Sequence, residues 1–356
     1  MNTRKKHTGN DDEAEAQSSF RKRKLRTVVK PGKVLPAGAR RGTVLTALGP
    51  HWLVAPEITD HGLDAVSLMV CSVSGTVDAQ GGTTLVAVGD VVWFVSSGSA
   101  MEVGGQEYAE GTIEKVETRR TLLSRKAAGR VQREQVLAAN IDRLGIVIAA
   151  ANPDYHRGLI DRYLIAADKG DLEPFIIVNK MDLVSGELET LIAEDLEVYT
   201  KALRRKVFFV STVSGFGIDL LTEFLNGATT LLAGQSGVGK SSLINHITQN
   251  HLRVGSISQA TGKGRHTTTS ALLVPLPRGG FVIDSPGTRE FSIWELDLQE
   301  IMYYFEEFDD YSPNCKFSTC THTHEPGCAV KDAVDKGAIN AGRYFSYLAL
   351  RAEIEG

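Results

Sequence analysis

The chain has 356 residues, 42% of them hydrophobic, and a formal net charge of -4. This length predicts two or three domains, and the apolar content is sufficient for packed cores. No segment approaches the roughly 18 uninterrupted apolar residues of a membrane-spanning helix, and the charged N-terminus lacks the apolar region of a secretory signal. These features argue against integral membrane and secreted proteins, so we expect a cytoplasmic protein. We also expect a monomer.

The first 41 residues form a basic segment. They hold twelve lysines and arginines against four acidic residues, which gives them a charge of +8 and leaves -12 for the rest of the chain. A segment so rich in one charge and so poor in apolar residues cannot bury enough surface to fold alone. We therefore predict a disordered tail over residues 1–41 that suits a polyanion such as RNA, with a merely solubilising tail as the alternative.

Residues 42–120 are predicted to form a small β-barrel of the OB type. Short runs of β-branched and apolar residues alternate there with turns, a pattern typical of such barrels. Trp52, Trp93 and Phe94 are either stacking platforms for nucleic-acid bases or core residues, and Trp93 fits the core better. Cys71 is expected to be a small core residue.

Residues 121–292 are predicted to form an α/β domain around a mostly parallel sheet. Apolar strands alternate there with amphipathic helices, as they do in such domains. One set of apolar residues recurs at helical spacing between two of the strands and is expected to form a single buried face. The set comprises Leu188, Leu191, Ile192, Leu196, Tyr199 and Leu203.

A phosphate-binding loop, GQSGVGKSS, occupies residues 234–242. It follows an apolar strand and opens a helix at Lys240, which is the context that this motif requires. The glycines allow backbone N–H groups to turn toward phosphates, Lys240 is expected on the β- and γ-phosphate oxygens as a catalytic residue, and Ser241 on Mg²⁺. The expected nucleotide-binding residues of the loop are Gly234, Gln235, Ser236, Gly237, Val238, Gly239, Lys240, Ser241 and Ser242.

Two further segments are predicted to complete the phosphate and Mg²⁺ site. DSPG, residues 284–287, ends another apolar strand, so Asp284 can hold Mg²⁺ through water while the N–H of Gly287 meets the γ-phosphate. In the basic loop GKGRHTTTS, residues 262–270, a threonine hydroxyl can reach Mg²⁺ only when the γ-phosphate is present. We expect Thr268 in this catalytic and nucleotide-binding role, although the loop could also contact RNA phosphates.

An Asn-Lys-x-Asp motif is predicted to select guanine. The Asp182 carboxylate can accept hydrogen bonds from N1–H and the N2 amino group of guanine, whereas N1 of adenine is itself an acceptor. Asn179 can bond the other edge of the base and bridge to the phosphate loop, and the stem of Lys180 can cover the base. Ser211 opens a loop that resembles the one whose backbone N–H receives guanine O6. The expected base-binding residues are Asn179, Lys180, Met181, Asp182 and Ser211.

These motifs stand in an unusual order, because the guanine motif precedes the phosphate loop, whereas an ordinary GTPase places it well after. Nucleotide-binding loops meet at one edge of a parallel sheet, so the point at which the chain begins does not alter the chemistry. We therefore predict a circularly permuted P-loop GTPase domain. Its last motif, residues 284–287, then runs directly into the C-terminal segment.

Residues 293–356 are predicted to form a small helical domain that binds one Zn²⁺. Cys315, Cys320, His322 and Cys328 form a C-x4-C-x-H-x5-C pattern, which supplies the three thiolates and one imidazole of a closed tetrahedral site. His324 is the competing imidazole. So small a segment needs a metal to hold it together, and this need makes unligated cysteines the weaker interpretation.

The permuted order, the N-terminal barrel and the segments GQSGVGKSSLIN, GKGRHTTT, DSPGTREF and CKFSTCTHTHEPGCAV together resemble the YjeQ-type family of bacterial GTPases that depend on the small ribosomal subunit. The likeness begins near residue 42 and leaves the basic tail outside. It implies a protein that uses GTP, GDP and Mg²⁺, binds the small ribosomal subunit and its rRNA, acts late in assembly, and hydrolyses GTP in response. The barrel segment CSVSGTV, residues 71–77, is less basic than the family pattern, so the tail is a possible substitute for its RNA contacts.

The group that orients the attacking water is not evident from the motifs. In many GTPases the glycine of the motif that corresponds to DSPG, residues 284–287, is followed directly by a glutamine, whereas Thr288 follows Gly287 here. His266 is the best internal candidate for catalysis, because an imidazole can hydrogen-bond water near neutral pH. The alternative is that His266 contacts RNA or faces solvent.

Two other functions remain open at this point. One is a ribosome-independent, kinase-like P-loop enzyme that uses Lys240 to transfer phosphate, although no acceptor pocket is evident. The other is a zinc-stabilised RNA-binding protein with an inert nucleotide site, against which the intact Lys240, Ser241 and Asp284 argue.

Overall fold

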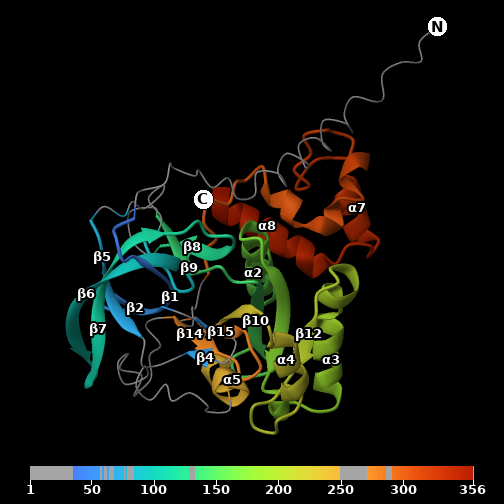
Figure 1. Cartoon of the computed structure of the whole chain (residues 1–356). Coiled ribbons are helices and arrows are strands. Elements are labelled where there is room, and N and C mark those ends of the chain that lie inside the picture. The colour runs from blue at the N-terminus through green and yellow to red at the C-terminus, as the bar shows by residue number, and fades with distance from the viewer. Residues whose placement is uncertain are drawn as a thin grey trace.

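The computed structural model describes residues 35–56, 58–59, 62–63, 68–75, 77, 84–127, 133–248, 271–285 and 291–355. Figure 1 shows a group of strands from the first third of the chain beside an α/β region, with the C-terminal segment lying against one side of that region. Most of the predicted basic tail lies outside the described residues. Strand β1 begins at Arg40, inside the last two residues assigned to that tail.

Five strands near the N-terminus form a closed ring of pairings. They are β1 (Arg40–Leu48), β2 (His51–Ala55), β5 (Met69–Val73), β6 (Val91–Val103) and β7 (Gln106–Val116). Pairing runs β1–β2–β5–β7–β6 and returns from β6 to β1, and only the β5–β7 pair is parallel. Within the described part of the chain, the short strands β3 (Ile58–Thr59) and β4 (Gly62–Leu63) form a two-stranded sheet of their own.

Alternation along these strands buries one face of the ring. Cys71 and Phe94 are fully buried there together with Val44, Val54 and Ile113, so Cys71 is a core residue, as predicted. Phe94 is therefore not available to stack on a base. Trp93 points the other way, is partly buried, and donates its indole N–H to Glu117 at 2.9 Å. Expecting Trp93 in the core was thus only partly right, because strand neighbours face opposite sides of a sheet.

The α/β region has a six-stranded sheet in the order β12–β11–β10–β13–β15–β14. Its strands are β10 (Arg143–Ala149), β11 (Glu173–Asn179), β12 (Val207–Phe209), β13 (Thr229–Ala233), β14 (Leu272–Pro275) and β15 (Phe281–Asp284). All neighbours in it are parallel except β14 and β15. Strand β14 also pairs antiparallel with β1 at Thr46 and Leu272, which joins the sheet to the N-terminal ring. A separate hairpin, β8 (Leu122–Lys126) and β9 (Glu134–Ala139), stands between the two parts in the chain.

Helices and helical turns connect the strands of this sheet. They are α2 (Arg157–Lys169), η3 (Met181–Leu183), α3 (Glu187–Asp195), the π-helical turn η4 (Val198–Ala202), α4 (Ile218–Leu225) and α5 (Lys240–Ile247). Aliphatic side chains of the strands, such as Ile146, Ile176 and Leu231, are completely buried beneath them. This core places the carboxyl ends of the parallel strands at one edge of the sheet.

The predicted buried stripe after β11 is correct in its second half and wrong in its first. Ile192, Leu196, Tyr199 and Leu203 are buried, as expected, whereas Leu188 and Leu191 are 48% and 52% exposed. Helix α3 has only nine residues, and every residue from 185 to 191 is exposed. The first turn of α3 therefore stands clear of the core, which the helix reaches only at Ile192.

The C-terminal segment has its own small core. Its elements are η5 (Ile301–Tyr304), η6 (Glu306–Phe308), η7 (Ser312–Asn314), α7 (Ala329–Asp335) and α8 (Ala341–Glu355). Phe305, Phe308 and Tyr347 fill the centre of this core, and Ile165 of α2 joins it from the α/β region. Helix α8 lies along α2 (Figure 1). No helix in the described part of the chain is long and apolar enough to span a membrane.

Candidate functional site

The phosphate loop lies between β13 and α5 in a conformation that only glycine adopts easily. Gly234, Gly237 and Gly239 have φ values of 153°, 84° and 95°, in the region that side-chain-bearing residues rarely enter. A Cβ on Gly234 would lie 2.1 Å from the carbonyl oxygen of Val147, and one on Gly239 would lie 2.3 Å from Nδ2 of Asn179. These glycines therefore allow the loop to pass close to β10 and to the guanine motif.

The ammonium group of Lys240 is held inside the loop. Its Nζ donates to the carbonyl oxygens of Gly234 at 2.9 Å and Gln235 at 2.8 Å. Burial lowers the pKa of Lys240, while the nearby charge of Asp284 acts in the opposite direction. Because Ser236 and Gly237 at the tip of the loop are exposed, phosphate oxygens could approach from solvent and take the place of these carbonyls.

A serine and an aspartate face each other beside this lysine. Ser241 Oγ, in the first turn of α5, donates to Asp284 Oδ2 at 3.0 Å, and Asp284 is a buried residue at the end of β15. A hydroxyl and a carboxylate next to a phosphate loop are oxygen ligands suited to Mg²⁺. The donor set therefore fits a magnesium nucleotide.

The guanine motif is tied to the phosphate loop by Asn179. This residue ends β11, is 1% exposed, and donates from Nδ2 to the carbonyl oxygen of Val238 at 2.9 Å. Lys180 follows in the left-handed conformation, with φ of 65°, and its Nζ bonds the carbonyl oxygen of Asn152. Met181 is buried beneath the motif.

Asp182 is oriented by a neighbouring loop. Its Oδ1 accepts a hydrogen bond from Ser211 Oγ, and the same hydroxyl oxygen accepts from the backbone N–H groups of Val213 and Ser214, each at 3.1 Å. The sequence singled out Ser211 for the backbone of its loop, but the structure also gives its side chain a place in the site. The sequence analysis did not predict the hydrogen bond between Lys180 and the carbonyl oxygen of Asn152. The position of Asn152 after β10 could have indicated a role at the site, since ligand-binding loops follow the carboxyl ends of parallel strands.

These separate segments meet at one edge of the sheet. The guanine motif begins at the last residue of β11, Ser211 follows β12, the phosphate loop follows β13, and Asp284 ends β15. Because the strands are parallel and adjacent, their carboxyl ends lie side by side whatever their order in the sequence. His266, Thr268 and Gly287, which complete the predicted site, lie outside the described residues.

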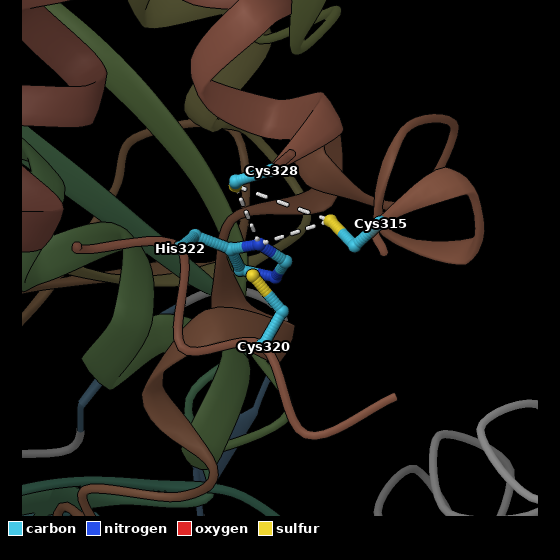
Figure 2. Close-up of side chains that lie close together, drawn as sticks. All are labelled: Cys315, Cys320, His322 and Cys328. Carbon is cyan, nitrogen blue, oxygen red and sulfur yellow. Dashed lines mark hydrogen bonds between the residues drawn. The ribbon is translucent and has the colours of Figure 1, made fainter. Parts of the chain in front are cut away.

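Four side chains converge at a second site in the C-terminal segment. The ligand atoms of Cys315, Cys320, His322 and Cys328 all lie within 4.8 Å of one another (Figure 2). Tetrahedral zinc with bonds of about 2.3 Å to sulfur and 2.0 Å to nitrogen sets the ligand atoms about 3.8 Å apart for two sulfurs and 3.5 Å for sulfur and nitrogen. The Sγ atoms of Cys315 and Cys328 are 4.0 Å apart, and His322 Nδ1 is 3.6 Å and 3.5 Å from them. The cluster is therefore compatible with one zinc ion.

The environment of His322 is suited to ligation through Nδ1. Its Nε2 lies 3.1 Å from Ser312 Oγ, a partner that would hold the other ring nitrogen as a donor. Burial lowers the pKa of His322 to about 4 and raises the pKa of the Cys320 and Cys328 thiols. A neutral imidazole is ready to bind metal, whereas the thiols need the cation to become thiolates. The competing His324 is exposed and outside the cluster, with Nδ1 2.9 Å from Thr323 Oγ1.

A buried ion-pair cluster fastens this segment to the α/β region. Arg343 of α8 donates from Nη1 to Asp161 of α2 at 2.6 Å, and from Nε and Nη2 to Glu307 at 2.6 Å and 3.0 Å. Tyr199 adds a hydrogen bond to Asp161 at 2.8 Å. The side chains of Arg343 and Asp161 are 2% and 0% exposed. Sequence inspection did not find this cluster, because its partners are far apart in the chain.

Comparison with known proteins agrees with this arrangement. The model of the RsgA GTPase family matches residues 116–294. A protein of Chlorobaculum tepidum named small ribosomal subunit biogenesis GTPase RsgA is 44% identical over 301 residues, covering 83% of this chain and 94% of the relative. A protein of the same name from Shewanella oneidensis is 36% identical over 315 residues, covering 88% and 83%.

Solved structures extend the likeness to the fold. The crystal structure of YjeQ from Thermotoga maritima matches with a TM-score of 0.65 and 31% identity, covering 89% of this chain and 99% of that one. YloQ, described as a circularly permuted GTPase, matches with a TM-score of 0.63 and 26% identity, covering 91% and 98%. The α/β region thus has the predicted permuted GTPase fold. On the combined evidence of sequence, fold and motif order, the chain belongs to the RsgA GTPase family.

Proposed function

We propose that this protein is a GTP hydrolase that binds the small ribosomal subunit, assists its late maturation, and hydrolyses GTP in response to the subunit. The observation that carries the nucleotide part is the link from Asn179 to Val238, which joins a guanine-selecting motif to a phosphate loop despite their permuted order. The subunit as partner is supported by the names of the relatives, which describe biogenesis of the small ribosomal subunit. We further propose that the protein acts as a monomer in the cytoplasm.

In this proposal, base selection falls to Asp182, and phosphate binding to Lys240 and the glycine-rich loop. Ser241 and Asp284 would hold Mg²⁺, which neutralises phosphate charge when it is bound. Thr268 would complete the magnesium shell, and the N–H of Gly287 would meet the γ-phosphate. The hydrogen bond from Ser211 to Asp182 supports an oriented carboxylate able to accept both guanine N–H groups.

Guanine selection has a direct test. Replacing Asp182 by Asn exchanges one hydrogen-bond acceptor for a donor. Asp182→Asn should therefore weaken the binding of guanine nucleotides and strengthen the binding of xanthine nucleotides, whose C2 oxygen is an acceptor. Binding of GDP, XDP and ADP to the wild type and the variant measures the change. Wild-type protein that binds ADP as tightly as GDP would contradict the assignment.

Water activation is assigned in this proposal to His266, since Thr288 is too short to replace a glutamine. Docking on the subunit would bring the imidazole of His266 to the attacking water. His266→Ala should keep GTP and subunit binding but lose most of the stimulated rate. Stimulated turnover within a few-fold of wild type in this variant would remove His266 from the mechanism.

The decisive experiment measures GTP turnover with and without purified ribosomal subunits. Small subunits should raise the rate by orders of magnitude, and large subunits at the same concentration serve as the control. Lys240→Ala, which lacks the lysine of the phosphate loop, gives the background rate of GTP turnover. Equal rates with and without small subunits would refute the proposed dependence on the subunit, and phosphate release without any added acceptor would exclude a strict kinase.

We also propose that the chain is divided into four consecutive parts: a basic disordered tail over residues 1–41, an OB-type barrel over 42–120, the GTPase domain over 121–292, and a zinc-binding helical domain over 293–356. The closed ring of strand pairings supports the barrel. The geometry of the cysteine and histidine cluster supports one Zn²⁺. Elemental analysis should find about one zinc per chain, and Cys320→Ser should lose it. Full zinc content in a variant lacking both Cys315 and Cys328 would exclude this site.

A further inference from the structure

The turn that carries His322 is bent into a conformation that needs support. His322 has φ of 58°, in the left-handed region that is unfavourable for residues with a Cβ. This bend brings Nδ1 of His322 to within hydrogen-bonding distance of the sulfurs of Cys315 and Cys328. Whatever stabilises the bend therefore also holds the imidazole among the thiols.

Glu325 is bonded to both flanks of this bend. Its Oε1 accepts hydrogen bonds from the backbone N–H of Thr321 at 2.9 Å and from the Thr321 hydroxyl at 2.6 Å, and its Oε2 accepts from the N–H of Thr323 at 3.1 Å. N–H groups that a left-handed residue turns toward a common point form a concavity for an anion. The Glu325 carboxylate fills it from within the chain.

Two tyrosines of α8 hold the carbonyl side of the same turn. Tyr344 donates its hydroxyl to the carbonyl oxygen of His322 at 2.7 Å, and Tyr347 donates to that of Thr321 at 2.5 Å. The peptide groups around His322 are thus fixed on both sides, with Glu325 bonding the N–H groups and the tyrosines bonding the carbonyls. Of these partners, Glu325 alone lies in the loop between two cluster residues, His322 and Cys328.

We infer that Glu325 is a positioning residue of the metal site, which presents His322 to zinc by bonding the turn on either side of it. The inference rests on the proposed zinc site and assigns Glu325 no direct bond to the ion. Only a carboxylate offers acceptors to all three donors at once. A glutamine at this position would turn an N–H group toward at least one of the N–H or O–H donors that the carboxylate now accepts.

The test compares variants by competition with a chromophoric zinc chelator, using the full chain. Glu325→Gln should lower zinc affinity by about 10- to 100-fold, the usual range for partners that orient metal ligands, and Glu325→Asp, which keeps the carboxylate, should recover part of the loss. Asp335→Asn is the matched control, because it removes the same charge from an exposed position on α7 of the same segment, and it should remain within about two-fold of wild type.

A second variant and a second readout separate positioning from general stability. Thr321→Val removes only one of the three donors and should lower zinc affinity less than Glu325→Gln, and the two changes should not be additive, because they affect one cluster. With Co²⁺ in place of zinc, Glu325→Gln should alter the visible absorption bands at saturation, since the imidazole is no longer held on the metal.

Two results would overturn the inference. Glu325→Gln that binds zinc as tightly as wild type, with an unchanged Co²⁺ spectrum, would show that Glu325 does not position the ligand, even if the variant were less stable. Wild-type protein that binds no zinc in elemental analysis would instead reject the metal site itself, and the role of Glu325 with it. Subunit-stimulated GTP turnover is measured separately, so neither result depends on the proposed enzymatic function.

Discussion

Replacing Arg343 should loosen the C-terminal segment more than any change at its exposed ion pairs. Arg343→Met keeps much of the side-chain volume against Phe305 but leaves the carboxylates of Asp161 and Glu307 without their cation. Asp161 would keep only the hydrogen bond from Tyr199, since its Oδ2 has no hydrogen-bond partner in the described structure. A buried charge that loses its partner is strongly destabilising.

The expected magnitude follows from burial. Breaking a buried ion pair by removing one partner costs about 3–5 kcal/mol, and each 1.4 kcal/mol or so is tenfold in an equilibrium constant. The opening equilibrium of α8 should therefore rise by roughly 100-fold or more. The matched control is Glu353→Gln, which breaks the contact of Arg162 with Glu353, whose side chains are 23% and 49% exposed. Such a pair is worth less than about 1 kcal/mol.

Native-state hydrogen exchange measures this difference directly. Amides of α8 in peptides from Ala341–Glu355 should exchange roughly 100-fold faster in Arg343→Met than in wild type, while those of Glu353→Gln stay within a few-fold. Adding Asp161→Asn to Arg343→Met should restore part of the loss, because the unpaired buried charge is then removed. Exchange in Arg343→Met that matches the Glu353→Gln control would refute the reasoning.

Two more predictions concern the α/β region. Gly239→Ala places a Cβ 2.3 Å from Asn179 Nδ2 at a φ of 95°, so GDP affinity should fall by at least about tenfold. Gly186→Ala is the control, since its φ is also positive but its Cβ meets nothing within 4 Å. Equal GDP affinity in the two variants would contradict the predicted clash. Burial alone would raise the pKa of Asp195, but the hydrogen bonds from Arg157 and Tyr155, together with the charge of Arg157, outweigh it, and the pKa is lowered. The stability that Asp195 adds is therefore complete above the unfolded pKa of about 3.9 and is lost as pH falls below it. The gap in urea midpoint between wild type and Asp195→Asn should narrow from pH 5 to pH 3, and a constant gap would exclude this linkage.

Much of the fold and the family could be predicted because the motifs are short and local. A phosphate loop needs its glycines, lysine and serine within nine residues, since backbone N–H groups of one turn bind the phosphates. The alternation of apolar strands and helices predicted a parallel sheet, and the comparisons confirm the family and the permuted fold. The order of the motifs alone was enough to predict the permutation.

Where a pattern could be satisfied in more than one way, only packing decided. Leu188 and Leu191 fit the helical stripe as well as Ile192 does, yet they are exposed, because the first turn of α3 has no core to face. His322 and His324 were both candidate ligands by spacing, and the left-handed bend at His322 turned that ring toward the thiols while His324 stayed outside.

The sequence by itself determined the chemistry available to this protein, because each motif contains its reactive groups within a few consecutive residues. The tertiary structure decided which distant groups act together. Ser211 lies 29 residues from Asp182, and Arg343 lies 182 residues from Asp161. No local pattern encodes such pairs, since they meet only when the sheet sets its strand ends side by side and when α8 packs along α2. Pairs of this kind arise from packing across the whole chain, and where both partners are buried, as Arg343 and Asp161 are, the loss of either partner is costly.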